Sequence, residues 1–467
     1  MGGVHHLLVL HWLPGAGLWF TPAAVPVALA WIGILAFLTG GAGRLLHHLT
    51  VRGGIAFLPA LPALWTALEW LPSVAGDLAF PWLGLPTALV PVPHLLAPAE
   101  LAGALTVTFW IVAFQGGVVD AWLRGGIRSR EGRGWAVAAA FLLLLPAGWS
   151  LHRSTSLELV SGPRVAALSL PLPERPMDSR ARAEEAVRDA RAALEAMEPD
   201  GIALVVWPEA AVPLLLDRPE GDPYLRGVRA LASGTGAVQL LGGYVARDGP
   251  LNALVVVGLE EDGWGPVYGK RRLVPGVEAV PGPLGRIPGS DREVIAGAGH
   301  AFRPGTGPGV LAVGHLRLGP LVCWEAAFRG PVRAAVRAGA DLLVNGTNDS
   351  FFHPPGAPEG WGWAGRRQHE AHLVLRAVET RRPAIRSATA GGAFVLDPVG
   401  RVVAGAPAGW SLAEKGGVVV APVLTAGTHS LFTRVGIDAG LAAFLLLLAL
   451  AMVAGRRGTE ERARRST

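Results

Sequence analysis

The sequence is poor in charged residues. Only 16% of its 467 residues are charged, against about 25% in an ordinary soluble domain. The deficit is concentrated near the N-terminus, where residues 1–122 contain only six charged side chains: Arg44, Arg52, Glu69, Asp77, Glu100 and Asp120. Residues 153–432 have near-normal polarity and are long enough for one large soluble domain. The composition therefore excludes both a wholly soluble protein and a purely membranous one.

Cysteine and lysine are also scarce. The single cysteine, Cys323, excludes an intrachain disulfide and a metal site made from several cysteines. Lysine occurs only at Lys270 and Lys415, and the remaining 39 of the 41 basic residues are arginine. The net charge is +5, but no basic stretch is interleaved with stacking aromatic residues, so the sequence does not indicate a nucleic-acid partner.

Apolar stretches long enough to cross a bilayer, about 20 residues, recur along the chain. They lie near residues 22–43, 54–72, 101–122, 134–150 and 434–454, with a shorter sixth, Val4 to Phe20, interrupted by Pro14. Five prolines between residues 78 and 98 exclude a continuous helix there, so we expect a re-entrant or interfacial segment. No basic region precedes the first apolar run, which argues against a cleavable signal peptide.

Arginines near the span ends indicate how the spans run, because cytoplasmic loops are enriched in Lys and Arg. They follow the second expected span, separate the fourth from the fifth, and follow the last: Arg44, Arg52, Arg124, Arg128, Arg130, Arg133, Arg456, Arg457, Arg462, Arg464 and Arg465. The alternate connections, 14–22 and 73–100, contain neither Lys nor Arg. The pattern predicts an N-terminal transmembrane domain of about five spans (1–152), a domain outside the cytoplasm (153–432) and a C-terminal span with a basic cytoplasmic tail (433–467).

Short β-rich runs alternate with helical patterns between residues 164 and 424. Helical periodicity is clearest over 181–197 and 365–381. The alternation predicts an α/β domain beside the multi-span α-helical membrane domain. Open α/β sheets place their chemistry where the strands end, and polar residues collect at several such places here.

Cys323 is the first candidate for chemistry. It ends the apolar run 319–323 and precedes a helix that we expect to begin near Ala326. A thiol at a strand-to-helix turn gains from the helix dipole, which favours the nucleophilic thiolate. The alternative is a small buried side chain, which is common for a lone cysteine.

Two further strand ends carry candidates of other types. Lys270 is retained in a chain that otherwise uses arginine, and a lysine ammonium is a compact charge that can stabilise a developing oxyanion. The alternative interpretation is that Lys270 is only a structural charge. Glu209 follows an apolar strand and is a candidate general base, or else a loop acid or helix cap. Glu278 and Glu325 are weaker candidates of the same kind.

Taken together, these segments resemble a known family. Trp207-Pro208-Glu209, the segment 268–275 containing Lys270, and Cys323-Trp324-Glu325 resemble, in order and spacing, the Glu-Lys-Cys triad of the carbon-nitrogen hydrolase (nitrilase) superfamily. With membrane spans on both flanks, the chain is similar to bacterial apolipoprotein N-acyltransferases. Further matching positions are Pro62-Ala63-Leu64-Trp65, Glu69, Phe80-Pro81-Trp82-Leu83, Asn348-Asp349, Phe352, Gln368-His369, Arg376-Ala377, Glu379, Arg382-Pro383, Arg386-Ser387 and Gly391.

The resemblance implies a nitrilase-like four-layer αββα sandwich and an enzyme without metal or cofactor. It implies transfer of a fatty acyl chain from a membrane phospholipid to the α-amino group of the diacylglyceryl-cysteine of an apolipoprotein, through a Cys323 thioester. Glu209 would move the proton, Lys270 and the Trp324 N–H would stabilise the oxyanion, and Glu278 would be the family's second carboxylate. The family places such a monomer in the bacterial inner membrane, with its catalytic domain in the periplasm.

The sequence departs from the family pattern in places, and two other functions remain open. Pro-Gly-Val-Glu ends the lysine motif in place of Pro-Phe-Gly-Glu, and Arg272 stands where His is common. The resemblance implies two further helices before residue 1, which are either absent or lie upstream of the given start. Loops 276–299 and 351–365 are expected lids. The alternatives are a membrane-tethered amidase or nitrilase with the same triad, and a degenerate membrane scaffold or transporter half, whose only intramembrane charge pair would be Glu69 and Asp120.

Overall fold

The computed structural model divides into two compact units. It describes residues 2–17, 24–171, 178–197, 201–247, 249–258, 265–279, 302–306, 309–353, 360–405 and 417–466. One unit, called the helical unit, comprises Met1–Leu10, Leu29–Leu157 and Ser430–Thr467, and the other, called the α/β unit, comprises His11–Ala28 and Glu158–His429. The sequence analysis placed residues 11–28 in the first domain, whereas in the structure they group with the α/β unit.

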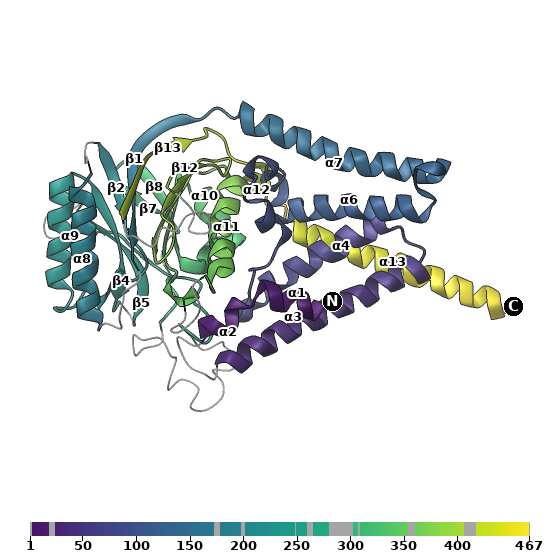
Figure 1. The fold of residues 1–467 in the computed structure, drawn as a ribbon, viewed down its shortest axis with the longest axis horizontal. Coiled ribbons are helices and arrows are strands. Elements are labelled where there is room, and N and C mark those ends of the chain that lie inside the picture. Colours follow the sequence, from purple (N-terminus) through teal and green to yellow (C-terminus); the bar gives the residue numbers. More distant parts are fainter. Residues whose placement is uncertain are drawn as a thin grey trace. The chain divides into compact units, whose positions relative to one another are not determined.

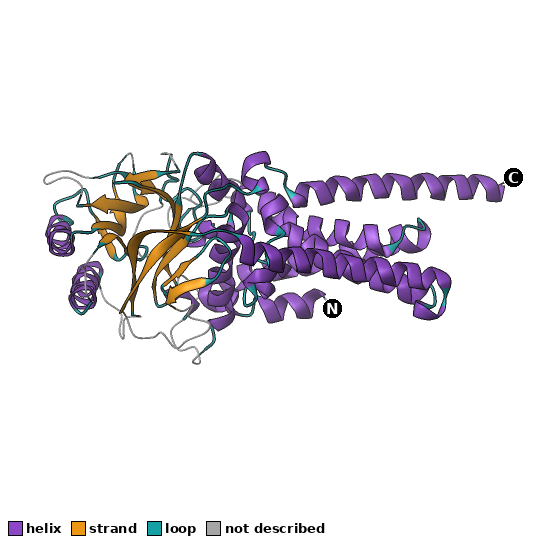
Figure 2. Ribbon diagram, turned by 90° about the horizontal axis from the view of Figure 1, so that it is seen from above, coloured by secondary structure: helices purple, strands orange, loops and turns teal. Residues whose placement is uncertain are grey.

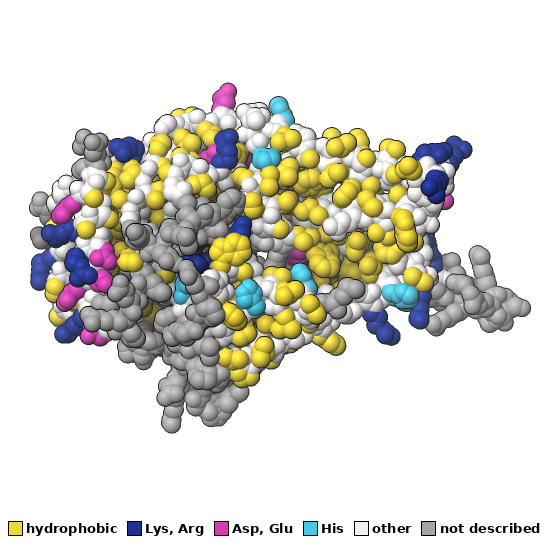
Figure 3. Space-filling model, in the orientation of Figure 1, with side chains coloured by type: hydrophobic (Ala, Val, Ile, Leu, Met, Phe, Trp, Pro, Cys, Tyr) yellow, Lys and Arg dark blue, Asp and Glu magenta, His cyan; other side chains and the backbone are white. Residues whose placement is uncertain are grey.

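The helical unit contains most of the long apolar helices. Its helices are α1 (Gly2–Val9), α3 (Ala24–His47) continued by the π-helical η1 (His48–Arg52), α4 (Phe57–Trp70), α5 (Ala99–Ala102), α6 (Leu105–Leu123), α7 (Arg130–Ser156), α12 (Leu431–Val435) and α13 (Ala439–Ser466). Within the described residues, four helices are long and apolar enough to cross a membrane: Val25–Arg52, Leu105–Leu123, Arg130–Ser156 and Ala439–Arg457. Hydrophobic side chains cover the face of this unit seen in Figure 3, and basic side chains gather at the end that carries the α6–α7 connection.

The expectation of a span over Val4 to Phe20 is wrong. The described residues there form α1, of eight residues, and α2 (Trp12–Gly17), of six. At 1.5 Å per residue, neither approaches the hydrocarbon thickness of about 30 Å. Pro14 has no N–H to bond the Leu10 carbonyl, which accounts for the break between the two helices.

The stretch from α4 to α5 is likewise not one long helix. α4 has only 14 residues, fewer than expected for the span near 54–72. It is followed by the short 3₁₀ helices η2 (Leu71–Val74), η3 (Gly76–Leu78), η4 (Leu85–Leu89) and η5 (Pro93–Leu95). The expectation that residues 78–98 form no continuous helix is confirmed.

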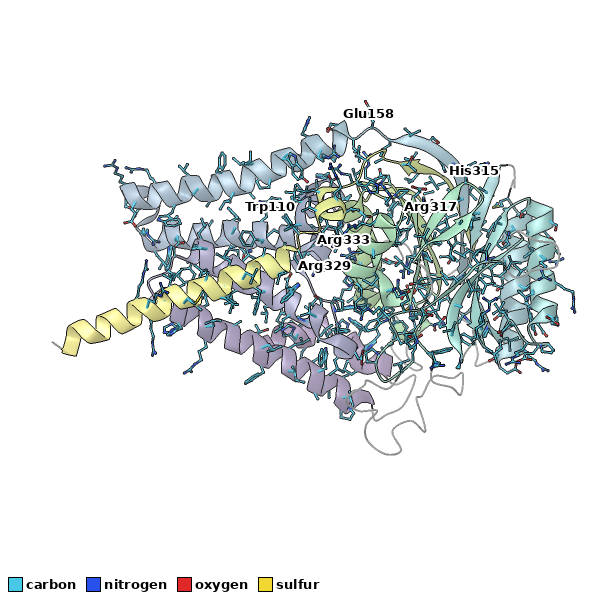
Figure 4. All side chains as sticks on the ribbon, turned by 180° about the vertical axis from the view of Figure 1, so that it is seen from behind. Trp110, Glu158, His315, Arg317, Arg329 and Arg333 are labelled. Carbon is cyan, nitrogen blue, oxygen red and sulfur yellow. The ribbon has the colours of Figure 1, made fainter. Side chains whose placement is uncertain are left out.

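Small residues and buried polar bonds hold the helices together. A Cβ atom at Gly116 of α6 would lie 2.8 Å from the Phe57 carbonyl oxygen at the start of α4, so glycine permits the close approach that membrane helices favour. Trp110 of α6, labelled in Figure 4, donates from Nε1 to the Leu142 carbonyl oxygen of α7 over 2.6 Å.

The two carboxylates that could have marked a transport path have structural partners. Asp120 accepts the Leu58 N–H at 2.7 Å and pairs with Arg124, also at 2.7 Å. Glu69 accepts bonds from the Trp65 indole, the Thr108 hydroxyl and the Leu85 N–H. These bonds tie α4 to η4 and α6, so the charge pair that would support a transporter is accounted for by the fold.

The α/β unit is built on one strongly bent sheet. Its strands are β1 (Val160–Leu170), β2 (Ile202–Val206), β3 (Val212–Leu215), β4 (Val238–Val245), β5 (Leu251–Val257), β6 (Val267–Gly269), β7 (Leu311–Val313), β8 (Leu316–Val322), β9 (Leu342–Asn348), β10 (Ala384–Thr389), β11 (Phe394–Leu396), β12 (Val402–Gly405) and β13 (Gly417–Thr425). The main order is β6-β5-β4-β2-β1-β10-β9-β8-β7. The six strands from β4 to β8 are parallel, and β5, β6 and β7 join antiparallel.

The two halves of this sheet pack face to face, because β5 contacts β8. A Cβ atom at Gly346 of β9 would lie 3.0 Å from both Leu254 Cδ2 of β5 and the Trp207 carbonyl oxygen. The outer faces are covered by α8 (Ser179–Glu195) with α9 (Asp222–Thr235), and by α10 (Arg329–Arg337) with α11 (Trp363–Thr380). Figures 1 and 2 show the strands lying between these two helical layers. The expected αββα sandwich is confirmed.

Local sequence explains these layers. β2 reads as a continuous apolar run and is buried along almost its whole length, as parallel strands usually are. On α8, buried Ala183, Ala186, Ala190 and Leu194 recur every three or four residues and face the core. The helical patterns expected over 181–197 and 365–381 correspond to α8 and α11.

Candidate active site

The candidate residues meet where strands of the two sheet halves end. Glu209 lies three residues beyond β2, Cys323 follows β8 directly, and Lys270 follows β6. A Cβ atom at Gly242 of β4 would lie 1.9 Å from the Pro208 carbonyl oxygen, so only glycine lets β4 pass this close to the turn carrying Glu209. The structure thus brings Glu209, Lys270, Glu278 and Cys323 into one buried cluster, which we call the triad cluster.

Lys270 is the centre of the charge network. Its side chain is 1% exposed, and Nζ lies 2.9 Å from Oε1 of Glu209 and 2.9 Å from Oε1 of Glu278. Burial alone would lower the pKa of Lys270, but the two carboxylates raise it well above its ordinary value. The site therefore holds a permanent ammonium ion whose position is fixed by two carboxylate groups.

Asn252 is a site residue that the sequence analysis missed. Its Nδ2 donates to Oε1 of Glu209 at 2.7 Å and to Oε1 of Glu278 at 2.9 Å. Its carbonyl oxygen accepts the Lys270 N–H at 2.7 Å, which fixes the backbone of the lysine to β5. The signal in the sequence was a single polar side chain inside the apolar strand 251–257, a position that has to find buried partners.

The remaining carboxylate oxygens are also held. Oε2 of Glu209 accepts the Asn348 N–H at 3.1 Å, and Oε2 of Glu278 accepts the Val274 N–H at 2.8 Å. Both carboxylates are therefore fixed at both oxygens. Glu278 is thus a second carboxylate that shares both Lys270 and Asn252 with Glu209.

Cys323 lies in a strained turn rather than at the start of an α-helix. It has φ +55° and opens the 3₁₀ helix η7 (Cys323–Ala327), while α10 begins only at Arg329. The helix expected near Ala326 is α10, which begins three residues later, at Arg329. Left-handed backbone at a non-glycine residue is costly and is found mostly at functional sites.

The surroundings of Cys323 oppose the thiolate that a helix dipole was expected to favour. Burial first, and then the negative charges of Glu209 and Glu278, raise the pKa of the Cys323 thiol well above its ordinary value, although Lys270 opposes this. The thiol is 4% exposed. At neutral pH it is protonated, so a base has to remove its proton during the reaction.

Trp324 and Glu325 fasten the turn of Cys323 to the loop of Lys270. The Trp324 indole donates to the Arg272 carbonyl oxygen. Glu325 accepts the N–H groups of Arg271 at 2.8 Å, Arg272 at 3.0 Å and Val322 at 2.7 Å, together with the Tyr268 hydroxyl. Burial raises the pKa of Glu325, but these backbone donors oppose the shift. Glu325, considered a possible base from sequence, therefore has all the bonds of a structural carboxylate.

The expected lids lie largely outside the described residues. Of loop 276–299 only 276–279 are described, and of loop 351–365 residues 354–359 are not; Lys415 is also outside. In the described part of the second loop, Trp361 and Trp363 are 38% and 44% exposed. Within the described ranges, no group of three or more His, Cys, Asp and Glu side chains is placed to hold a metal ion.

The chain matches known protein families over most of its length. The family model for carbon-nitrogen hydrolase matches residues 164–421, and the model for the apolipoprotein N-acyltransferase N-terminal domain matches residues 1–117. An apolipoprotein N-acyltransferase of Geobacter metallireducens is 31% identical over 76% of this chain and 67% of its own length. One of Gloeobacter violaceus is 29% identical over all of this chain and 86% of its own.

Solved structures were compared as well. A carbon-nitrogen hydrolase of Helicobacter pylori G27 is 17% identical, covering 61% of this chain and 94% of its own, with a TM-score of 0.42. The Nit3 protein of Saccharomyces cerevisiae is also 17% identical, covering 60% of this chain and 96% of its own, with a TM-score of 0.40. The two family models and the identity to the Geobacter protein establish that the chain belongs to the apolipoprotein N-acyltransferase family, within the carbon-nitrogen hydrolase superfamily.

Proposed function

We propose that this protein transfers a fatty acyl chain from a membrane phospholipid to the α-amino group of a diacylglyceryl-cysteine at the N-terminus of an apolipoprotein. Membership of the apolipoprotein N-acyltransferase family supports the reaction class. The observation that carries the chemistry is the buried Lys270 ammonium held between Glu209 and Glu278, in the same cluster as the Cys323 turn. These residues provide a base, an oxyanion partner and a nucleophile.

The first half-reaction forms a thioester. Glu209 accepts the thiol proton as Cys323 Sγ attacks the ester carbonyl carbon of the phospholipid, because the resting thiol is protonated. The oxyanion that develops is stabilised by Lys270, with the Trp324 backbone N–H as second donor. Collapse of the tetrahedral intermediate breaks the carbon–oxygen bond, and the departing alkoxide takes the proton from Glu209. A lysophospholipid leaves, and the acyl group remains on Cys323.

The second half-reaction moves the acyl group to nitrogen. The neutral α-amino group of the acceptor attacks the thioester carbonyl, and Glu209 again accepts a proton. Collapse of this intermediate releases the Cys323 sulfur, which regains a proton as the amide forms. Glu278 stays bonded to Lys270 and Asn252 throughout and keeps the ammonium in place. No cofactor enters the scheme.

Exclusion of water supports transfer rather than hydrolysis. Glu209, Lys270 and Cys323 are 6%, 1% and 4% exposed. A thioester in such surroundings is protected from water until the acceptor amine arrives. A membrane-tethered amidase or nitrilase would use the same residues but release its product to water.

We place the α/β unit on the periplasmic side of the bacterial inner membrane. The α1–α2 break removes one expected membrane crossing. In the sequence, α7 precedes the α/β unit and α13 follows it, so the arginine-rich connection before α7 and the tail after α13 still lie on the same side of the membrane. A reporter fused after Val160 should be periplasmic, and one fused at Gly126 cytoplasmic. A cytoplasmic signal at Val160 would contradict this placement.

The function is tested by a transfer assay with the full-length protein in detergent–phospholipid micelles. The donor carries an isotopic label in its acyl chain, and the acceptor is a synthetic peptide with an N-terminal diacylglyceryl-cysteine. The proposal predicts label in an amide on the peptide α-amine, and none on a matched peptide whose α-amine is acetylated. Label released only as free fatty acid would identify a hydrolase, and no movement of label would refute both activities.

A further inference from the structure

Thr347 lies beside the nucleophile because of the strand register. β8 and β9 are parallel, with Val322 opposite Gly346, and Cys323 directly follows β8 while Thr347 directly follows Gly346 in β9, which brings the two residues to the same edge of the sheet. The Thr347 hydroxyl is within hydrogen-bond reach of the Cys323 thiol, and Thr347 is fully buried. The two half-reactions leave this hydroxyl without a role.

The hydroxyl has a second partner in Asp349. Thr347 Oγ1 donates to Oδ1 of Asp349 over 3.3 Å, and the same oxygen lies 3.0 Å from His369 Nδ1. Oδ2 accepts a bond from the Arg386 guanidinium. Burial alone would raise the pKa of Asp349, but Arg386 and His369 hold it well below its ordinary value. Asp349 is therefore a fixed carboxylate, and His369 donates to it from Nδ1.

Arg386 is also linked to the backbone of Cys323, through the side chain of Asn345. Its Nη1 donates to Oδ1 of Asn345 at 3.0 Å. The Asn345 amide in turn donates to the Cys323 carbonyl oxygen at 3.1 Å and to the Leu321 carbonyl oxygen at 3.2 Å. One buried guanidinium thus fixes both the strained turn of Cys323 and the carboxylate behind Thr347.

We propose that Thr347 is a further catalytic residue, whose hydroxyl donates a hydrogen bond to Cys323 Sγ as the sulfur becomes negative. Asp349, fixed by Arg386 and His369, is the positioning residue: in the resting site it accepts the hydroxyl's hydrogen bond and keeps the Thr347 oxygen next to the sulfur, and it gives up that bond when the hydroxyl turns to Sγ. The inference rests on the proposed function, because it concerns the formation of the thioester.

The exchange of bonds balances without a further proton acceptor. The thiol proton goes to Glu209, and the electron pair on sulfur forms the bond to the acyl carbon. The Thr347 proton stays on its own oxygen, and the hydroxyl only rotates from Asp349 to the sulfur. Its bond to Asp349, at 3.3 Å, is long and therefore weak. Lys270 Nζ already donates to two carboxylates. A separate donor to Cys323 Sγ therefore stabilises the negative charge that develops on the sulfur, which the neighbouring carboxylates repel.

The first test compares Thr347→Val with Thr347→Ser in the full-length protein. Valine keeps the shape and removes the hydroxyl, so we expect acyl-enzyme formation on Cys323, followed by intact mass, to slow about 10- to 100-fold, the usual effect of losing a hydrogen bond to a charged group. The pH midpoint for alkylation of Cys323 by iodoacetamide should also rise. Serine restores the hydroxyl, so Thr347→Ser should recover most of the acylation rate and reverse most of the shift in the alkylation midpoint. Thr380→Val is the matched control, because this buried hydroxyl bonds only within α11, to the Arg376 carbonyl oxygen.

The second test asks whether Asp349 acts through Thr347. Asp349→Asn alone should slow acylation, whereas Asp349→Asn added to Thr347→Val should cause little further loss, because the hydroxyl to be positioned is already absent. If Asp349→Asn fails to fold with Arg386 unpaired, the valine–serine comparison still decides. Wild-type acylation and an unchanged alkylation profile in Thr347→Val would overturn the inference. Absence of any adduct on wild-type Cys323 would instead refute the proposed function.

Discussion

Replacing Lys270 by arginine separates the charge of this residue from its shape. The ammonium nitrogen lies 2.9 Å from each of two carboxylate oxygens and is almost fully buried. An arginine keeps the positive charge, so Glu209 and Glu278 remain neutralised. Its planar guanidinium cannot place a compact charge at the position of Nζ.

The expected magnitudes follow from this geometry. Crowding a larger head group into the site should cost about 1–3 kcal/mol of folding free energy, which a protein of ordinary stability tolerates. Loss of a fixed oxyanion donor should slow acylation about 10²- to 10³-fold, or roughly 2.7–4 kcal/mol. Lys270→Met, in contrast, leaves two buried carboxylates without their cation and should cost about 3–5 kcal/mol of stability.

The assay is the initial rate of acyl-enzyme formation on Cys323, with thermal unfolding of the same preparations as the control for folding. We expect Lys270→Arg to remain folded and to acylate slowly, and Lys270→Met to lose both stability and activity. A folded Lys270→Arg protein that acylates at the wild-type rate would refute the reasoning, because Lys270 would then be only a structural counter-ion.

Two further predictions follow from the triad cluster and its supports. Glu325→Gln places an amide nitrogen next to backbone N–H groups that now donate to a carboxylate oxygen, so the free energy of unfolding should fall by about 1–3 kcal/mol. The control is Glu195→Gln at an exposed position, which should leave the melting temperature unchanged. Equal melting temperatures for the two variants would contradict the structural role of Glu325. Because burial raises the pKa of the Cys323 thiol, alkylation of the folded protein should have its midpoint well above about 8.5, the value of an unperturbed cysteine, and denaturant should return it there. The unfolded chain loses this proton first, so the contribution of Cys323 to stability should be lost as pH rises above about 8.5. Titration of the folded protein near or below that value would contradict this.

Most of the fold could be predicted from local patterns. The continuous apolar run of β2 and the periodicity of α8 are strong signals, because each reflects burial against a neighbouring layer. The prediction of one span over Val4 to Phe20 was wrong because apolar composition does not distinguish one spanning helix from two short ones. Pro14 was visible in the sequence, but its effect on the Leu10 carbonyl depends on backbone geometry.

The candidate site was only partly accessible from the sequence. Glu209 and Cys323 were found because each ends an apolar run, and Lys270 because the chain otherwise uses arginine; all three lie in the buried cluster. Asn252 was missed because it is a single polar residue inside an apolar strand, and Thr347 because it is one of several polar residues at the end of β9; the importance of each depends on which residues lie opposite. The rise in the pKa of the Cys323 thiol could not be predicted, since it depends on burial and on carboxylates that come from distant segments.

The measurement that tests the central claim most directly is intact-mass spectrometry of the full-length protein after incubation with a phospholipid of defined acyl chains. The account predicts a mass increase of one acyl group on Cys323, release of one equivalent of lysophospholipid, and discharge of the adduct by the diacylglyceryl-cysteine peptide. Cys323→Ala should show neither adduct nor lysophospholipid. An adduct that persists in Cys323→Ala, or lysophospholipid released at the wild-type rate by that variant, would contradict a reaction through the Cys323 thioester.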